Sequence, residues 1–135
     1  MVEVTVIVEV EVNPTEDETK VRTAINNVLG NAEIILKPAQ RGSILIAEAK
    51  GQDSLTKLRN MLRNDRIRDA ARRLLFKSTR GNTISFCLNK QVAFAGHVSF
   101  CEETAESPLG PIRFKIETDN AQQLIEWLAE KTEKT

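Results

Sequence analysis

The first twelve residues alternate between valine and mostly polar side chains, and this pattern limits the fold more than any other feature of the chain. Alternation with a period of two is typical of a β-strand that buries one of its faces. The predicted buried positions are Val2, Val4, Val6, Val8, Val10 and Val12. We therefore expect a sheet with one face covered by other elements.

A helix and two further strands are predicted to follow. The helix begins with a capping box formed by Thr15 and Glu18, and it stops at Gly30. Its apolar stripe consists of Val21, Ala24, Ile25, Val28 and Leu29. Residues 32–37 and 43–50 then have the pattern of two strands.

Residues 83–100 are predicted to form a β-hairpin with the loop Asn89-Lys90-Gln91. In this register the apolar side chains share one face, whereas a two-residue turn would divide them between both faces. They are Ile84, Phe86, Leu88, Val92, Phe94, Val98 and Phe100. Cys87 then faces Ala93 and lies roughly 26 Å from Cys101, at about 3.3 Å per residue. A disulfide needs Cα atoms within about 7 Å, so two free thiols are expected.

A stiff loop over 106–111, a strand over 112–117 and a helix capped by Asp119 complete the predicted elements. The stripe of this helix is Ala121, Leu124, Ile125 and Leu128, with Trp127 at its edge. The order β-α-β-β-α-α-β-β-β-α predicts a single α+β domain over residues 1–135. Its helices are expected on one face of a mostly antiparallel sheet.

Composition argues against several classes of protein. The 135 residues are 41% hydrophobic and 28% charged, as expected for one globular domain with a core. No apolar run approaches the roughly 20 residues of a membrane span. The acidic first segment does not resemble a signal peptide, so we expect a cytoplasmic protein without membrane contact. One histidine and two cysteines argue against a zinc site, and no cofactor is expected.

The sequence contains no arrangement that predicts catalysis. The phosphate-binding patterns GxxxxGK[ST] and GxGxxG are absent. His97 falls on a predicted strand with no acid at the spacing of a triad, and Cys87 is expected to be a small buried residue. Glu102, Glu103 and Glu106 are more typical of a solvated acidic loop than of a cation site. We therefore predict that the protein is not an enzyme.

The net charge of zero conceals a basic middle, because residues 55–80 carry nine Lys/Arg and two Asp. The apolar residues of this stretch form two misaligned arcs, one over 55–62 and one over 67–75. A single helix would have to bury both sides, so two helices meeting near Asn64-Asp65 are predicted. Asp53-Ser54 can cap the first of them, and Asn64 or Asp65 the second.

A concentrated basic face is typical of proteins that bind a phosphate backbone, and also of an ordinary solvated helix. Asp65 and Asp69 lie within helical reach of Arg68, Arg72 and Arg73 and can occupy some of these cations. The residues predicted to contact RNA are Arg63, Arg66, Arg73, Lys77 and Arg80, with Lys90 at the edge of the surface.

The aromatic residues indicate which kind of RNA the protein can bind. The chain has no tyrosine, and only Phe76 falls on a polar arc. Binding of single strands needs several exposed rings, whereas a folded RNA can be recognised through its backbone and shape. Structured RNA is therefore the predicted partner. The alternative is a protein-interaction or assembly subunit, either with a partner protein or as a homodimer, that has no contact with RNA.

Four segments resemble one known family. They are EVEVNPTEDETKV, RIRDAARRLL, LNKQVAFAGHVSF and ESPLGPI, and together they extend over nearly the whole chain. The family is archaeal, and its members are predicted to bind RNA or to associate with the exosome. The resemblance implies a fold similar to that of ribosomal large-subunit protein five, an α+β domain that contacts ribosomal RNA. It supplies no RNA-contacting or catalytic residues.

Overall fold

The computed structural model describes residues 3–40, 42–101 and 111–130. In chain order the elements are β1 (Val4–Val12), α1 (Glu18–Val28), β2 (Glu33–Pro38), β3 (Ser43–Lys50), the 3-10 turn η1 (Gln52–Leu55), α2 (Thr56–Asn64), α3 (Arg68–Lys77), β4 (Thr79–Arg80), β5 (Thr83–Leu88), α4 (Lys90–Phe94), β6 (Phe100–Cys101), β7 (Ile112–Thr118) and α5 (Ala121–Leu128). The predicted α+β class is confirmed.

All strand pairs of the sheet are antiparallel within the described residues. The strand order is β2-β3-β1-β7-β5-β4, and β6 pairs with β5 beside this path. The alternating first segment thus becomes a central strand, with β3 on one side and β7 on the other. Its valines from Val4 to Val12 are buried, as the pattern predicts.

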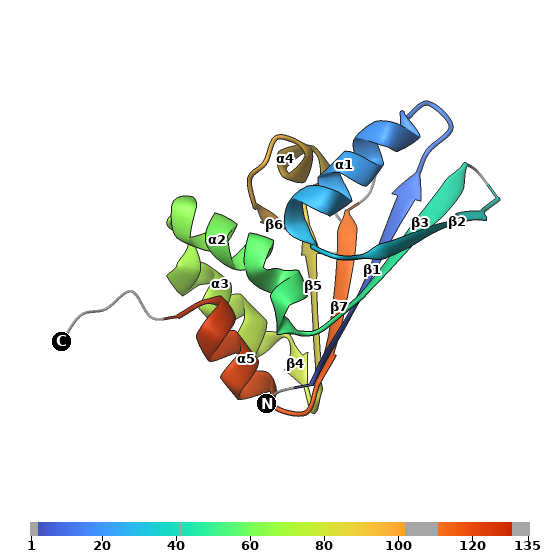
Figure 1. Ribbon diagram of the computed structural model, residues 1–135. Helices are drawn as coiled ribbons and strands as arrows, with labels where there is room; N and C mark the ends of the chain where they lie inside the picture. The colour runs from blue at the N-terminus through green and yellow to red at the C-terminus, as the bar shows by residue number, and fades with distance from the viewer. Residues whose placement is uncertain (1–2, 41, 102–110, 131–135) are drawn as a thin grey trace.

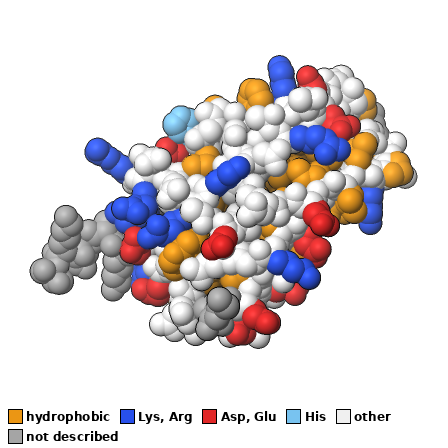
Figure 2. All heavy atoms as spheres, viewed as in Figure 1, with side chains coloured by type: hydrophobic (Ala, Val, Ile, Leu, Met, Phe, Trp, Pro, Cys, Tyr) orange, Lys and Arg blue, Asp and Glu red, His pale blue; other side chains and the backbone are white. Residues whose placement is uncertain are grey.

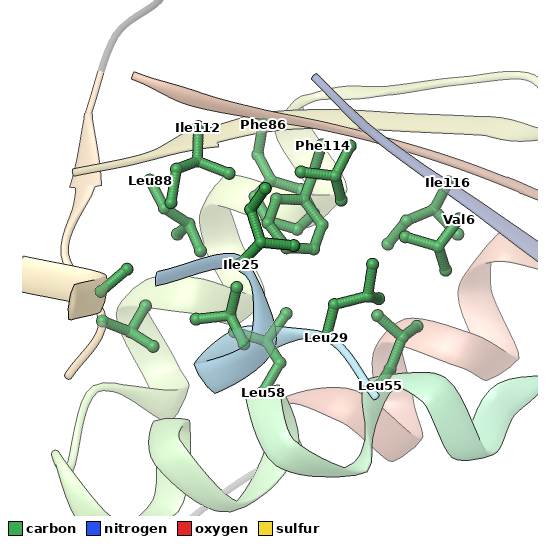
Figure 3. Close-up of a cluster of buried hydrophobic side chains, with 14 of the residues drawn as sticks. Val6, Ile25, Leu29, Leu55, Leu58, Phe86, Leu88, Ile112, Phe114 and Ile116 are labelled. Atoms are coloured by element: carbon green, nitrogen blue, oxygen red, sulfur yellow. The ribbon is translucent and has the colours of Figure 1, made fainter. Parts of the chain in front are cut away.

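The helices lie on one face of the sheet (Figure 1). Figure 3 shows Ile25 of α1 beside Phe114 of β7, with Leu29, the residue just after α1, in the same core. Phe86 stacks on Phe114 with 4.8 Å between the ring centroids. The predicted stripes of α1 and α5 are buried in this core. The described helices leave the other face of the sheet open.

The predicted hairpin over 83–100 is wrong. Its first strand is β5, but the chain then turns into α4, because the Asn89 side chain accepts the N–H of Val92 and caps a short helix. The cross-strand neighbour of Phe86 is Phe114 of β7 instead of a residue of the same hairpin. Phe94 is 44% exposed.

The predicted separation of the two cysteines is also wrong. β6 pairs with β5 so that Cys101 lies directly opposite Cys87. Both residues are thiols in the structure, as predicted, but distance is not the reason. The error follows from the hairpin, because replacing the second strand by α4 brings residues 100–101 back to β5.

Two helix caps differ from the prediction by one or two residues. The α1 cap is Asp17 instead of Thr15, and its carboxylate accepts the N–H of Thr19 at 2.9 Å. The α5 cap is Asn120, while the carboxylate of the neighbouring Asp119 accepts the N–H of Glu3. Asp and Asn suit either position, so a one-residue choice depends on tertiary contacts that the sequence pattern does not contain.

The end of α1 also differs from the prediction. Leu29 is already extended, and Gly30 donates its N–H to the Ser54 carbonyl oxygen. The left-handed residue that redirects the chain is Asn31, with φ 54°. Glycine is therefore not the residue that ends the helix here.

Part of the predicted organisation lies outside the described residues. This applies to Glu102, Glu103 and Glu106 and to most of the 106–111 loop. Within the described ranges, the structure has no helix long and apolar enough to cross a membrane.

Candidate nucleic-acid interface

The basic stretch forms two helices, as predicted. α2 buries Leu58 and Leu62, and α3 buries Ala71 and Leu75. The helices are separated at residues 65–67, where Arg66 has φ 57°. A non-glycine residue rarely adopts this left-handed conformation, so the corner is a defined change of direction instead of a bend in one helix.

Asp65 connects this corner to the segment before β6. Its carboxylate accepts the N–H of Val98 and contacts His97 Nδ1, both at 3.0 Å. Burial acts to raise the pKa of Asp65, but the bonds from His97 and Val98 outweigh it and hold the pKa below its usual value. His97 lies after α4 instead of on the predicted strand, and its side chain is exposed.

The predicted caps of both basic helices are wrong. Asp53-Ser54 belong to the turn η1, and the Ser54 hydroxyl donates to the Gly51 carbonyl oxygen instead of capping α2. α3 starts after Ile67 without a side-chain cap. The Asp65 carboxylate is already engaged by His97 and Val98, which explains why it is not available to α3.

One group of arginines is directed toward α5 and the residues just after it, where it meets carboxylates. Arg59 donates to the Trp127 carbonyl oxygen at 2.9 Å and to Glu130 Oε1 at 2.8 Å. Arg68 lies 3.7 Å from the same Glu130 oxygen, and Arg72 pairs with Glu126. The sequence prediction placed such partners at Asp65 and Asp69, because a pattern on one helix cannot show acids that arrive from a later helix.

A second group of cations points away from the core. The side chains of Arg63, Arg66, Arg73, Lys77 and Arg80 belong to exposed residues. Over residues 3–40, 42–101 and 111–130, none of these five takes part in an ion pair with a carboxylate. Figure 2 shows basic side chains gathered at the end of the molecule that α2 and α3 occupy. We call these five residues the exposed basic group.

Lys90 does not belong to this surface, and its prediction as an RNA contact is wrong. Only 5% of Lys90 is exposed. Its Nζ donates to the Glu11 carbonyl oxygen at 2.7 Å and to Glu16 Oε1 at 3.0 Å. Because residue 90 begins a helix instead of a hairpin tip, its side chain reaches back to the loop between β1 and α1.

Exposed aromatic rings are few in the described residues. Phe76 is 38% exposed, as its polar position predicts, and the Arg72 guanidinium lies 5.1 Å from its ring centroid. Phe94 is exposed as well and lies beneath Lys20 Nζ. Phe94 was missed because the hairpin assignment placed it on the core face. Each of these two rings therefore already lies against a cation of this chain.

The fold and this surface define an α+β sheet domain with exposed cations on a helix pair. A family model described as RNA binding matches residues 5–118. A UPF0201 protein of Sulfurisphaera tokodaii is 46% identical over 129 residues, which cover 96% of this chain and 89% of the relative. One from Pyrobaculum islandicum is 45% identical over 91% of this chain and 87% of the relative.

A solved structure that is also a UPF0201 protein has a similar fold. The crystal structure of a UPF0201 protein from Methanococcus jannaschii is 32% identical, with a TM-score of 0.85 over 96% of this chain and 95% of that chain. The chain belongs to the UPF0201 family of archaeal proteins.

Proposed function

We propose that this protein is a non-catalytic RNA-binding module that contacts the phosphate backbone of structured RNA through the exposed basic group. The observation that carries the proposal is the sorting of charges on α2 and α3. Of the nine basic residues over 55–80, Arg59, Arg68 and Arg72 are held by Glu126 of α5 and by Glu130 just after it. Lys57 donates to the Asn26 carbonyl oxygen, and the five residues of the exposed basic group remain directed outward. The description of the matching family model supports RNA as the partner.

Few aromatic side chains are available to stack on bases, and this favours structured RNA over single strands as the partner. Each base stacked on an aromatic side chain contributes about 1–3 kcal/mol, so a protein that binds single strands needs several such rings. Phe76 and Phe94 are the large exposed rings of the described chain, and each lies beside a cation. Guanidinium and ammonium groups aimed at phosphates fit the recognition of a folded RNA by backbone and shape.

The test is the salt dependence of binding to a structured RNA. Each phosphate contact contributes about −0.7 to −0.9 to the slope of log affinity against log salt, so the five residues of the exposed basic group give a slope of about −3.5 to −4.5. The variant Arg66→Ala/Arg73→Ala/Lys77→Ala should keep its fold, and the two contacts that remain should give a slope of about −1.4 to −1.8.

A matched control removes three cations elsewhere. Lys37→Ala/Lys50→Ala/Lys115→Ala changes the net charge by the same amount on exposed strand positions. It should lower affinity weakly and leave the slope near that of the wild type. Absence of binding at low salt, or equal slopes for the two triple variants, would reject the exposed basic group as an RNA site.

The open face of the sheet favours a second candidate, a protein-interaction or assembly subunit. Ile35 on the edge strand β2 is 51% exposed and lies opposite Ile46 of β3, which is half-buried. The backbone groups on the outer side of an edge strand can pair with a strand of a partner or of a second copy. Failure to bind RNA would give preference to this reading. The implied association with the exosome and the likeness to ribosomal large-subunit protein five stay predictions.

A further inference from the structure

We propose that Cys87 and Cys101 form a redox-active pair that closes to a reversible intrachain disulfide between β5 and β6. The proposal is independent of RNA binding. It rests on the pairing of two short strand segments, on the face that the two side chains share and on the hollow that both of them line.

The pairing places the two backbones at the separation that a disulfide needs. Asn89 donates its N–H to the Ser99 carbonyl oxygen at 2.8 Å, so residues 89 and 99 are a hydrogen-bonded pair. Cys87 and Cys101 are Cα partners two residues further along the same ladder, which makes them a pair of the same kind. The Cα atoms of such a pair are about 5.5 Å apart. Disulfides span about 4.4–6.8 Å between Cα atoms. Their Cβ atoms lie about 3.5–4.5 Å apart, whereas opposed residues of a sheet have Cβ atoms about 4.5–5.5 Å apart, so closure also requires a small shift of β6 toward β5.

The side chains of both cysteines point to the open face of the sheet. Phe86 and Leu88 are buried in the core, and so their neighbour Cys87 is directed to the opposite face. Phe100 follows the same rule in β6, since its ring packs edge-on against Phe86 with 5.7 Å between the centroids. Cys101 therefore emerges on the same face as Cys87.

A hollow of about 530 Å³ is lined by both cysteines, and Leu74 of α3 and its C-cap Ser78 border it as well. Arg113 and Lys115 of β7 also line it, and Arg113 is the Cα partner of Cys87. The thiolate is the nucleophile in disulfide exchange. Cys101 is the more accessible of the two, while Cys87 is buried. Cys101 is therefore the residue that an oxidant meets first.

The oxidant is a low-molecular-weight disulfide, RSSR. The Cys101 thiolate attacks one sulfur of RSSR, which forms a Cys101–SR bond and releases RS⁻. The Cys87 thiolate then attacks Cys101 Sγ, which forms the Cys87–Cys101 bond and releases the second RS⁻. The protein loses two electrons and two protons, and RSSR becomes two RSH. Burial raises the pKa of Cys101, so the reaction should accelerate as pH rises.

Closure would fix β6, which is held to β5 by two residue pairs and by the neighbouring bond from the Asn89 N–H to the Ser99 carbonyl oxygen. β6 begins shortly after Val98, whose N–H binds Asp65 at the corner of α2 and α3. With the disulfide closed, the segment between β5 and this corner is anchored at Cys101, three residues from Val98. A chain crosslinked in this way has a more restricted unfolded state, so its melting temperature should rise on oxidation.

The experiment exposes the reduced full-length chain to buffers with increasing oxidised-to-reduced glutathione ratios. Samples are quenched with an alkylating agent, thiols are counted in denaturant, and the crosslink is located by peptide mass spectrometry. We expect both thiols to disappear together, a Cys87–Cys101 peptide in monomeric protein, a higher melting temperature and full reversal by dithiothreitol. Cys101→Ser should lose the crosslink and the temperature shift, and Cys87→Ala should instead accumulate a glutathione adduct on Cys101.

Three results would overturn the proposal. They are a lasting glutathione adduct on the wild-type protein, a disulfide between two chains, and retention of both thiols in excess oxidised glutathione while the denatured chain reacts. The Cys87→Ala variant distinguishes an inaccessible Cys101 from a failure of the second step. Because it conserves a small apolar side chain at the buried position, it should retain the fold.

Discussion

Lys90 Nζ lies 3.0 Å from Glu16 Oε1, and both side chains are largely shielded from solvent. The same ammonium group binds the Glu11 carbonyl oxygen, so α4 is tied to the end of β1 and to the loop before α1. Burial acts to raise the pKa of Glu16, but hydrogen bonds from Asn13 and Lys90 and the charge of Lys90 outweigh it and lower that pKa. The lowered pKa favours the carboxylate form of Glu16, and the pair has a structural role.

Removal of the charge of Glu16 should destabilise the fold strongly. Glu16→Gln leaves the buried Lys90 ammonium without a counter-charge, and breaking a buried pair on one side costs about 3–5 kcal/mol. Glu16→Gln/Lys90→Met should recover much of this loss, because neither charge remains. The free energy of unfolding in denaturant measures both. Glu18→Gln is the matched control, since Glu18 pairs with Arg22 on the surface and such pairs contribute about 0.3–0.5 kcal/mol. Equal losses for the two glutamine variants would contradict a structural role.

The folded protein should be less stable in acid, because Glu16 and Asp65 then become protonated. Both carboxyl groups have a folded-state pKa below the ordinary values of 4.5 and 3.8. A lowered folded-state pKa contributes stability that is present above the unfolded pKa and is lost as pH falls through the folded one. The free energy of unfolding should therefore decrease below about pH 4.5, the ordinary pKa of Glu16. Urea titrations from pH 7 downward should show a smaller decrease for Glu16→Gln and for Asp65→Asn than for the wild type.

Arg66 offers a way to separate RNA affinity from stability. Its backbone is left-handed, a conformation that costs a non-glycine residue roughly 1–2 kcal/mol. Arg66→Gly should therefore be as stable as the wild type or more stable, while the salt slope of RNA binding loses about one contact. Arg63→Gly removes a cation from the last turn of α2, where glycine costs about 1 kcal/mol. Thermal melts and binding titrations of both variants test this, and a less stable Arg66→Gly would contradict the strain argument.

The local periodicities of the sequence were sufficient for most elements. The valine alternation, the stripe of α1 and the two misaligned arcs of the basic stretch each predict an element that the structure contains. These signals are local, because each face is defined by residues of one segment. The hairpin failed because alternation over residues 92–98 was also compatible with a short helix. The helix forms because the Asn89 side chain caps it.

The candidate site was less predictable, because its charges are sorted by residues distant in the sequence. Exposed positions such as Arg73 and Lys77 could be selected from the helical pattern. The carboxylates near Arg68 and Arg72 belong to Glu130, just after α5, and to Glu126 of α5, and no spacing rule connects them with the basic helices. Lys90 was misplaced for the same reason, since its partner Glu16 lies in the first loop of the fold.

The central position of β1 has a consequence for the order in which the domain can form. Val4 near the start of the chain pairs with Thr118 of β7, whereas β3 reaches the other edge of β1 after a much shorter connection. A long loop loses conformational entropy as it closes, before its stabilising contacts have formed. Pairings between segments distant in the sequence therefore slow folding. β1 with α1, β2 and β3 can assemble early, but one edge of β1 stays unpaired until β7 has been synthesised. During translation that valine-rich edge is available to other chains for nearly the whole time that the ribosome needs to make the domain.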